Sequence, residues 1–267
     1  MLQTSGIFKL TLRENLRGQV LWTSTLVGSV LLILTGVIGG IALSHENRVV
    51  DVFSYFISDQ LLLLVGIFSG ASLCSNDFSA RGMAELYIPA GVSRHALFLA
   101  RLNAYAFMLL LVSMALYCLK IFLLPQLADV PTALNLKIQC VMIIFSWLKS
   151  TTALAIAAFF GCLARPLFAS LATLILFSMG HLTSTFDSLL TSAQLSRAND
   201  TLGLLYGPLY FALKIWNPSL LTVESLNGEW LIPAGQAILL AISWSAGFIL
   251  CAVALALFRI NSMNIRQ

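Results

Sequence analysis

The sequence predicts an all-α integral membrane protein with six transmembrane helices, an N-terminal amphipathic interfacial helix and cytoplasmic N- and C-termini. Two observations predict this class: the composition and the length of the apolar runs. Of the 267 residues, 59% are hydrophobic and 10% are charged, and the mean hydropathy is +0.91. A globule of this size has too little interior to hide so much apolar surface. The composition therefore excludes a soluble enzyme, a disordered chain and a nucleic-acid-binding domain.

Six apolar runs approach or exceed the length of about 20 residues that a helix needs to cross a bilayer. They cover residues 20–43, 52–74, 96–119, 139–163, 166–182 and 233–258. The first run is too long for the apolar part of a signal peptide, so we expect it to stay as an anchor. We find no internal repeat and no soluble domain. The sequence thus predicts one transmembrane domain over residues 1–267, in which 75–95 form a cytoplasmic loop and 183–232 an outer loop.

The positive charges predict the orientation of the six spans. With the N-terminus in the cytoplasm, nine of the 15 Lys and Arg residues fall in inner segments, five fall in outer segments, and Lys149 lies within a span. Cytoplasmic loops of membrane proteins carry an excess of Lys and Arg. This bias favours a multi-pass protein of the inner (cytoplasmic) membrane with both termini inside.

Residues 1–19 predict an amphipathic helix before the first span. An apolar stripe repeats every four residues, and a basic stripe follows one position later, about 100° round the helix. The stripes are Phe8, Leu12 and Leu16, and Lys9, Arg13 and Arg17. Such a helix suits the inner interface, where its cations meet anionic headgroups. The alternative is a simple basic flank of the first span.

The loop 75–95 predicts a short, stiff element between the second and third spans. Residues 84–88 can form a helix that Pro89 and Gly91 end, and Ser93 can cap the helix that follows. Glu85 lies four residues after Arg81, on the same helical face.

This loop resembles that of the permease subunits of ABC-2 type ABC transporters. The family includes the nitrous-oxide-reductase maturation and the cytochrome c maturation permeases. The matching residues occur in the family's order: Asp77, Arg81, Gly82, Glu85, Leu86, Pro89, Ser93, Arg94 and Arg101. The family usually has Lys at the last place, where this chain has Arg. The amphipathic helix, the six spans and the pair Asn217 and Pro218 in the last outer loop are also similar, so the likeness covers nearly the whole chain.

The resemblance implies that the loop is a coupling helix, which docks on a separate ATPase subunit. The residues that would couple the two subunits are Arg81, Gly82, Glu85, Leu86, Tyr87, Pro89 and Arg94. The resemblance also implies a homodimer or heterodimer of permeases on a dimer of ATPases. An ordinary charged loop is the alternative.

Several absences bear on mechanism. The chain has no Gly-x-x-x-x-Gly-Lys followed by Ser or Thr, so we expect ATP and Mg to be bound by the partner ATPase and this chain to have no catalytic residue or cofactor. No pair of cysteines has metal-ligand spacing, and we interpret all five as packing residues rather than metal or redox groups. They are Cys74, Cys118, Cys140, Cys162 and Cys251.

Two charges fall inside predicted spans. Asp59 lies in the second span and Lys149 in the fourth, at similar depths slightly outside the midplane. They predict either a polar point on the translocation path or a structural ion pair, with Lys149 extending to the outer interface as a further alternative. A secondary carrier or channel that uses these charges is therefore a second hypothesis for function.

An intramembrane serine protease is a third hypothesis. Ser72 follows Gly70 as a nucleophile would, and His181 could be its base. The topology opposes this, because Ser72 lies near the inner end of its span and His181 near the outer end.

Residues 202–216 are apolar but too short to cross, which predicts a re-entrant helix or an outer amphipathic helix. The preferred hypothesis is an ATP-driven permease subunit for an unidentified substrate.

Overall fold

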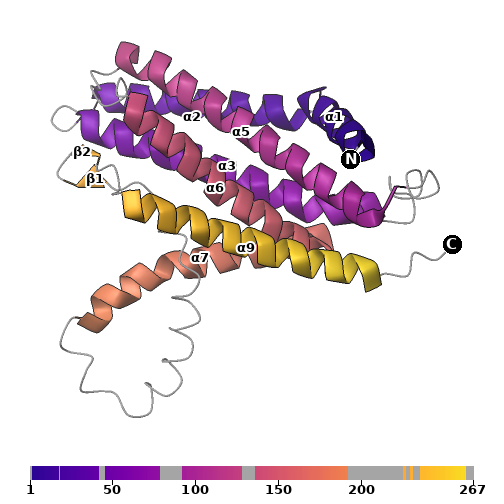
Figure 1. Ribbon diagram of the computed structural model, residues 1–267. Helices are drawn as coiled ribbons and strands as arrows, with labels where there is room; N and C mark the ends of the chain where they lie inside the picture. Colours follow the sequence, from indigo (N-terminus) through magenta and orange to yellow (C-terminus); the bar gives the residue numbers. More distant parts are fainter. Residues whose placement is uncertain are drawn as a thin grey trace.

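The computed structural model describes residues 2–17, 19–41, 46–78, 92–127, 136–191, 225–226, 229–230 and 235–262. These residues form seven helices and one small hairpin (Figure 1). The helices are α1 (Leu2–Arg17), α2 (Gln19–Ile41), α3 (Glu46–Phe78), α5 (Arg94–Leu127), α6 (Leu136–Gly161), α7 (Pro166–Thr191) and α9 (Gly235–Ser262). The antiparallel strands β1 (Ser225–Leu226) and β2 (Glu229–Trp230) were not predicted by the sequence.

Within these described residues, four helical segments are long and apolar enough to cross a membrane. They are Val52–Cys74, Arg94–Leu123, Lys137–Gly161 and Ile238–Ser262. Helices α1 and α2 meet at a bend of 47°, and a fifth span results if this pair is counted as one. The apolar part of α7, Pro166–Gly180, would extend only about 22 Å, against about 30 Å of hydrocarbon. The helical, multi-pass class is confirmed, and the number six stays a prediction.

The ends of the helices follow local sequence signals. The side-chain oxygen of Ser93 accepts a hydrogen bond from the backbone N–H of Ala96 at 3.3 Å, which confirms the predicted cap of α5. Helix α6 ends at Gly161, and α7 begins at Pro166, a residue favoured at the first helical position because it has no N–H to satisfy. The turn between them is short, so the two helices contact each other.

Helices α3 and α6 form the centre of the bundle. A Cβ atom on Gly66 of α3 would lie 2.6 Å from the carbonyl oxygen of Ser150, and one on Gly161 of α6 would lie 2.6 Å from that of Ala71. Gly70 approaches the carbonyl oxygen of Leu154 in the same way. Small residues allow this close contact between the two backbones, which is typical of helix pairs in membranes.

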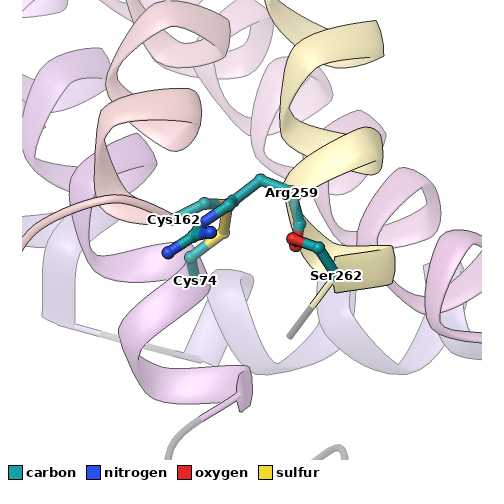
Figure 2. The surroundings of a disulfide bond; sticks show 4 residues. All are labelled: Cys74, Cys162, Arg259 and Ser262. Carbon is teal, nitrogen blue, oxygen red and sulfur yellow. A yellow bond between two sulfur atoms is a disulfide. The ribbon is translucent and has the colours of Figure 1, made fainter. Parts of the chain in front are cut away.

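A disulfide bond joins the same two helices at one end of the bundle. It links Cys74 of α3 to Cys162, directly after α6, with the Cα atoms 5.3 Å apart. Figure 2 shows Arg259 of α9 extending its side chain toward this bond. The interpretation of all five cysteines as packing residues is therefore wrong for these two. Cys118, Cys140 and Cys251 are free thiols on exposed positions of their helices.

Helix α1 packs on the first turns of α5. Ile7 forms a buried cluster with Val92, Leu97 and Ala100 of α5 and the residues before it. The buried face of α1 is centred on Ile7 and Thr11, while Leu16, which we placed on the apolar stripe, is 40% exposed. The basic stripe is exposed as predicted. Figure 1 shows α1, the start of α5 and the end of α9 at the same end of the bundle.

Candidate functional site

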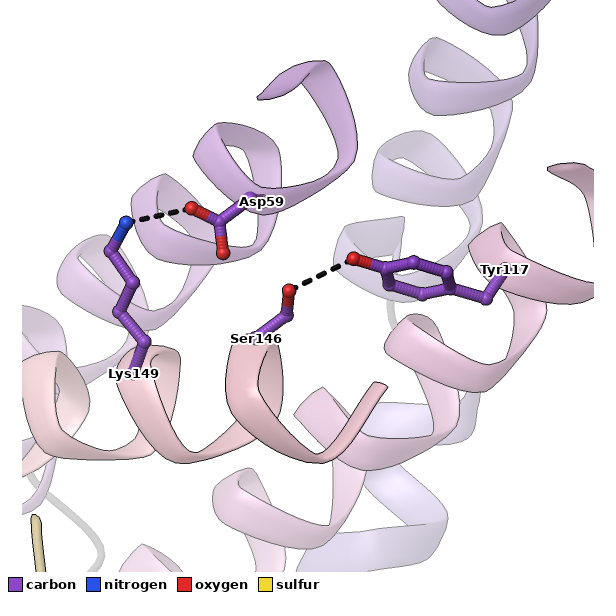
Figure 3. Close-up of polar contacts among 4 residues, drawn as sticks. All are labelled: Asp59, Tyr117, Ser146 and Lys149. Carbon is purple, nitrogen blue, oxygen red and sulfur yellow. Dashed lines mark hydrogen bonds and ion pairs between the residues drawn. The ribbon is translucent and has the colours of Figure 1, made fainter. Parts of the chain in front are cut away.

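The two charges predicted inside the spans meet between α3 and α6. The Lys149 Nζ atom donates a hydrogen bond to Asp59 Oδ2 at 2.7 Å (Figure 3). The side chains of Lys149 and Asp59 are 2% and 4% exposed. Both charges are therefore removed from solvent and from lipid, and their mutual contact offsets part of the desolvation cost.

Helix packing brings this pair together. Ser150, the neighbour of Lys149, is at the level of Gly66, where the backbones of α3 and α6 approach closely. Asp59 lies seven residues before Gly66, or about 10 Å along α3. Side chains on a helix tilt toward its N-terminus, and because α3 and α6 run parallel, this direction on α6 points toward Asp59. The close approach of the two backbones at Gly66 and the length of the lysine side chain together bring Lys149 within hydrogen-bond distance of Asp59.

A second polar contact lies one helical turn away and includes α5. The hydroxyl groups of Tyr117 and Ser146 are 3.0 Å apart, and either can be the donor. Figure 3 shows the two contacts next to each other, with side chains from three helices. Trp147 adds a hydrogen bond from its ring N–H to the carbonyl oxygen of Ala106 at 2.8 Å. Helix α5 is thus joined to α6 by polar contacts at both levels.

Buried polar residues continue from this point toward the end of the bundle that holds the N-terminus of α6. Each of them is less than 9% exposed, and they come from α3, α5 and α6. They are Ser54, Tyr55, Ser58, Ser113, Lys120 and Gln139. Such a group of polar side chains between apolar helices is costly to desolvate and is commonly a site of function in membrane proteins.

One oxygen of Asp59 has no hydrogen-bond partner. Asp59 Oδ2 accepts from Lys149, while Oδ1 is buried and accepts no bond within the described residues. An ionised carboxylate can accept bonds at both oxygens, so Oδ1 can bind a water molecule or a donor group of a substrate. The site can therefore hold a fixed ion pair and one further polar ligand.

The coupling residues predicted by the resemblance fall mostly outside the described residues. These are Arg81, Gly82, Glu85, Leu86, Tyr87 and Pro89. Arg94 is described, and it forms the first residue of α5. Arg101, the last residue of the resemblance, is only 7% exposed, and its Nη2 atom lies 3.8 Å from Glu14 Oε2 of α1. Arg101 is buried because α1 covers this face of α5.

The residues of the protease hypothesis do not come together. Ser72 of α3 donates its hydroxyl proton to the carbonyl oxygen of Ser69 at 3.0 Å. Helix α7 begins near the Cys74–Cys162 bond, at about the same depth in the bundle as Ser72. His181 follows Pro166, the first residue of α7, by 15 residues, which places it about 22 Å further along that helix. The side chain of His181 and the predicted re-entrant segment 202–216 lie outside the described residues.

Sequence reasoning missed two members of the polar group. Tyr117 lies within the predicted span 96–119 and Lys120 comes directly after it, where we predict an outer segment, yet both are fully buried. Their spacing of three residues on one helix, with Ser113 a turn before Tyr117, is a signal that could have found this polar face. Within the described part of the chain, no group of three or more His, Cys, Asp or Glu residues could hold a metal ion.

The chain was also compared with known proteins. No protein-family model matches the sequence, and no curated protein is significantly similar to it.

Proposed function

We propose that this chain is the membrane-spanning permease subunit of an ATP-driven transporter of the ABC-2 type. Separate ATPase subunits bind ATP and Mg, and two permease chains enclose the path of the substrate. The resemblance over residues 77–101 and the order of amphipathic helix, spans and loops support this proposal. The chain acts in the inner membrane, with the loop 75–95 on the side of the ATPase.

The packing of α1 on the start of α5 is the observation that carries the proposal. Ile7 of α1 contacts the segment that leads out of the predicted coupling loop, and Phe8 meets Phe107 with ring centroids 6.3 Å apart. Glu14 and Arg101 add a charged contact. A force applied to the loop by an ATPase would therefore act on α1 and α5 together. An ordinary surface loop has no need for such an anchored exit.

Helix α5 also provides a route from the loop to the polar site. It is continuous over 34 residues from Arg94 to Leu127. Tyr117 lies 23 residues after Arg94, or about 35 Å along this helix. Since a helix transmits displacement along its axis with little loss, movement of the loop reaches the contact between Tyr117 and Ser146 of α6. This arrangement supports coupling between ATP-driven closure and the centre of the bundle.

The Asp59–Lys149 pair holds α3 to α6 in this proposal. The pair is nearly inaccessible and lies beside the close glycine contacts, as expected of a structural ion pair. The unpartnered Asp59 Oδ1 favours the second candidate, a carrier in which the carboxylate binds a substrate or an ion. The two functions differ in their energy source, because a carrier transports in an ion gradient without any ATPase.

Docking of an ABC ATPase tests the proposal. The tagged chain is produced together with an ABC ATPase encoded by a neighbouring gene, and the ATPase that co-purifies is measured. We expect wild-type protein to retain the ATPase, and Arg81→Ala or Glu85→Ala to retain less while inserting normally, because these changes remove charges from the predicted docking loop and not from a predicted span. Glu229→Ala, in β2, is the matched control for loss of a charge. Equal recovery with all three variants would refute the coupling assignment.

A further inference from the structure

A lateral cleft opens between α2, α3 and α5, away from the polar site. Its volume is about 530 Å³, and its walls are mainly apolar. Val27 of α2 and Leu64 and Phe68 of α3 line it and are 47%, 41% and 59% exposed. In a membrane these exposed side chains face lipid, so the mouth of the cleft opens toward the acyl chains of the bilayer.

Short side chains create the cleft, and their hydroxyl groups are satisfied locally. Thr23 donates to the carbonyl oxygen of Gln19 at 2.7 Å, and Ser72 donates to that of Ser69 at 3.0 Å. Each of these hydrogen bonds joins two residues of the same helix, the first in α2 and the second in α3. The walls therefore offer few free polar groups to a ligand and suit a hydrocarbon chain better than water or a sugar.

The depth of the cleft matches one leaflet. On α3 it extends from Leu61 to Ser72, which is about 16 Å along the helix. Half of a hydrocarbon core of about 30 Å is about 15 Å. The end at Ser72 is level with the start of α2, because α2 and α3 are antiparallel neighbours. The cleft thus extends from the membrane interface that carries α1 to the midplane.

A row of exposed cations lies at the interfacial end of the cleft. Arg17, the last residue of α1, precedes the cleft residue Thr23 by six residues in the sequence, at the bend between α1 and α2. Lys9 and Arg13 continue the row along the exposed side of α1. Cations at this level attract negatively charged headgroups. The cleft therefore combines an apolar groove one leaflet deep with a positive charge at its interfacial end.

We propose that this cleft binds one anionic phospholipid, with an acyl chain along α3 and its phosphate near Arg17. A helix from a second copy fits poorly, because one turn of helix with its side chains occupies about 500 Å³ and would fill the whole volume. An acyl chain is narrower and follows the full length of the cleft. This site depends on the membrane location of the chain and is independent of the transport function proposed above.

Lipid retention measures this binding. The chain is purified from vesicles of equal parts phosphatidylglycerol and phosphatidylethanolamine, and the phospholipids that remain bound are counted by native mass spectrometry. Val27→Phe fills the mouth of the cleft and should abolish the retained lipid. Leu26→Phe is the matched control, since Leu26 is 65% exposed and does not line the cleft. Ser69→Val fills the cleft from its floor and serves as a second variant if Val27→Phe unfolds.

Charge removal tests the headgroup. Arg17→Gln should lower retained phosphatidylglycerol about five-fold and leave phosphatidylethanolamine unchanged. Arg165→Gln, at the exposed α6–α7 turn on the same side of the bundle, should change neither. Equal retention in Val27→Phe, Ser69→Val and Leu26→Phe would overturn the site. No preference for phosphatidylglycerol would overturn the headgroup assignment, and a disulfide between two Val27→Cys chains would replace the lipid by a second copy.

Discussion

Lys149 and Asp59 place opposite charges within hydrogen-bond distance inside the bundle. Each charge costs about 2.5 to 3.5 kcal/mol at the centre of a transmembrane helix, so neither persists there without a partner or a functional need. Lys149→Met removes one partner and leaves the Asp59 carboxylate unpaired. We expect a loss of about 3 to 5 kcal/mol in the free energy of unfolding, measured by thermal or denaturant unfolding in detergent.

The double variant separates the two roles of this pair. Lys149→Met combined with Asp59→Asn leaves no unpaired charge, so a structural pair should regain most of the lost stability. Lys137→Met, at the exposed start of the same helix, should cost little and serves as the control. If Lys149→Met keeps wild-type stability but changes transport or ATPase stimulation, the pair lines the path. Wild-type stability together with wild-type activity would contradict both roles.

Sequence reasoning located this pair because depth in a membrane can be counted along two parallel helices that enter from the same side. Asp59 and Lys149 lie at similar distances from the ends of their spans, so their proximity in depth could be predicted. Their actual contact could not, since it depends on how α3 and α6 are rotated about their axes. The sequence also does not reveal how α5 is rotated about its axis, and the burial of Tyr117 and Lys120 was missed for this reason.

At the scale of elements, α3 and α6 depend on glycine for their close contact. Gly66→Ala would force a Cβ atom to within 2.6 Å of the Ser150 carbonyl oxygen, and this backbone atom cannot move aside as a flexible side chain would. We expect a clear fall in the melting temperature of Gly66→Ala. Gly247→Ala is the matched control, because no atom of another described element lies within 4 Å of its added Cβ. Ala favours a helix over Gly, so this control should be neutral or slightly stabilised.

The disulfide between Cys74 and Cys162 predicts how many cysteines react with an alkylating reagent. Of the five cysteines, only Cys118, Cys140 and Cys251 should react when the purified, unreduced chain is denatured and alkylated. Reduction before alkylation should add Cys74 and Cys162, and the mass of the intact chain records the difference. Alkylation of all five without reduction would exclude the bond in the purified protein. Cys74→Ser should free Cys162 and serves as the control.

The apolar runs predicted most helices well, because hydrophobic length is a property of consecutive residues. The second, third, fourth and sixth runs correspond to the segments that are long and apolar enough to span. The buried face of α1 was predicted less well. Ile7 and Thr11 pack against α5, and a hydropathy pattern that favours Phe8, Leu12 and Leu16 cannot reveal which neighbour covers the helix. The disulfide also depends on tertiary packing and has no local signal.

On the scale of the whole molecule, the proposal connects three parts in series. The loop 75–95 receives force from an ATPase, α5 carries it with α1 attached, and the polar contacts among α3, α5 and α6 respond. Each part has a distinct chemical character: a loop whose sequence is rich in charge, a continuous helix, and buried hydrogen bonds. The proposal therefore requires a second polypeptide that binds ATP, since the sequence has no P-loop of its own.

The rate of ATP hydrolysis by the partner ATPase tests this requirement most directly. The ATPase is measured in sealed vesicles with the wild-type chain, with the Arg81→Ala, Glu85→Ala double variant, and without the chain. We expect the wild-type chain to change the hydrolysis rate and the double variant to leave it at the level of the ATPase alone. Identical rates in all three preparations, together with uptake driven by an ion gradient in vesicles that lack the ATPase, would contradict the account and identify a secondary carrier.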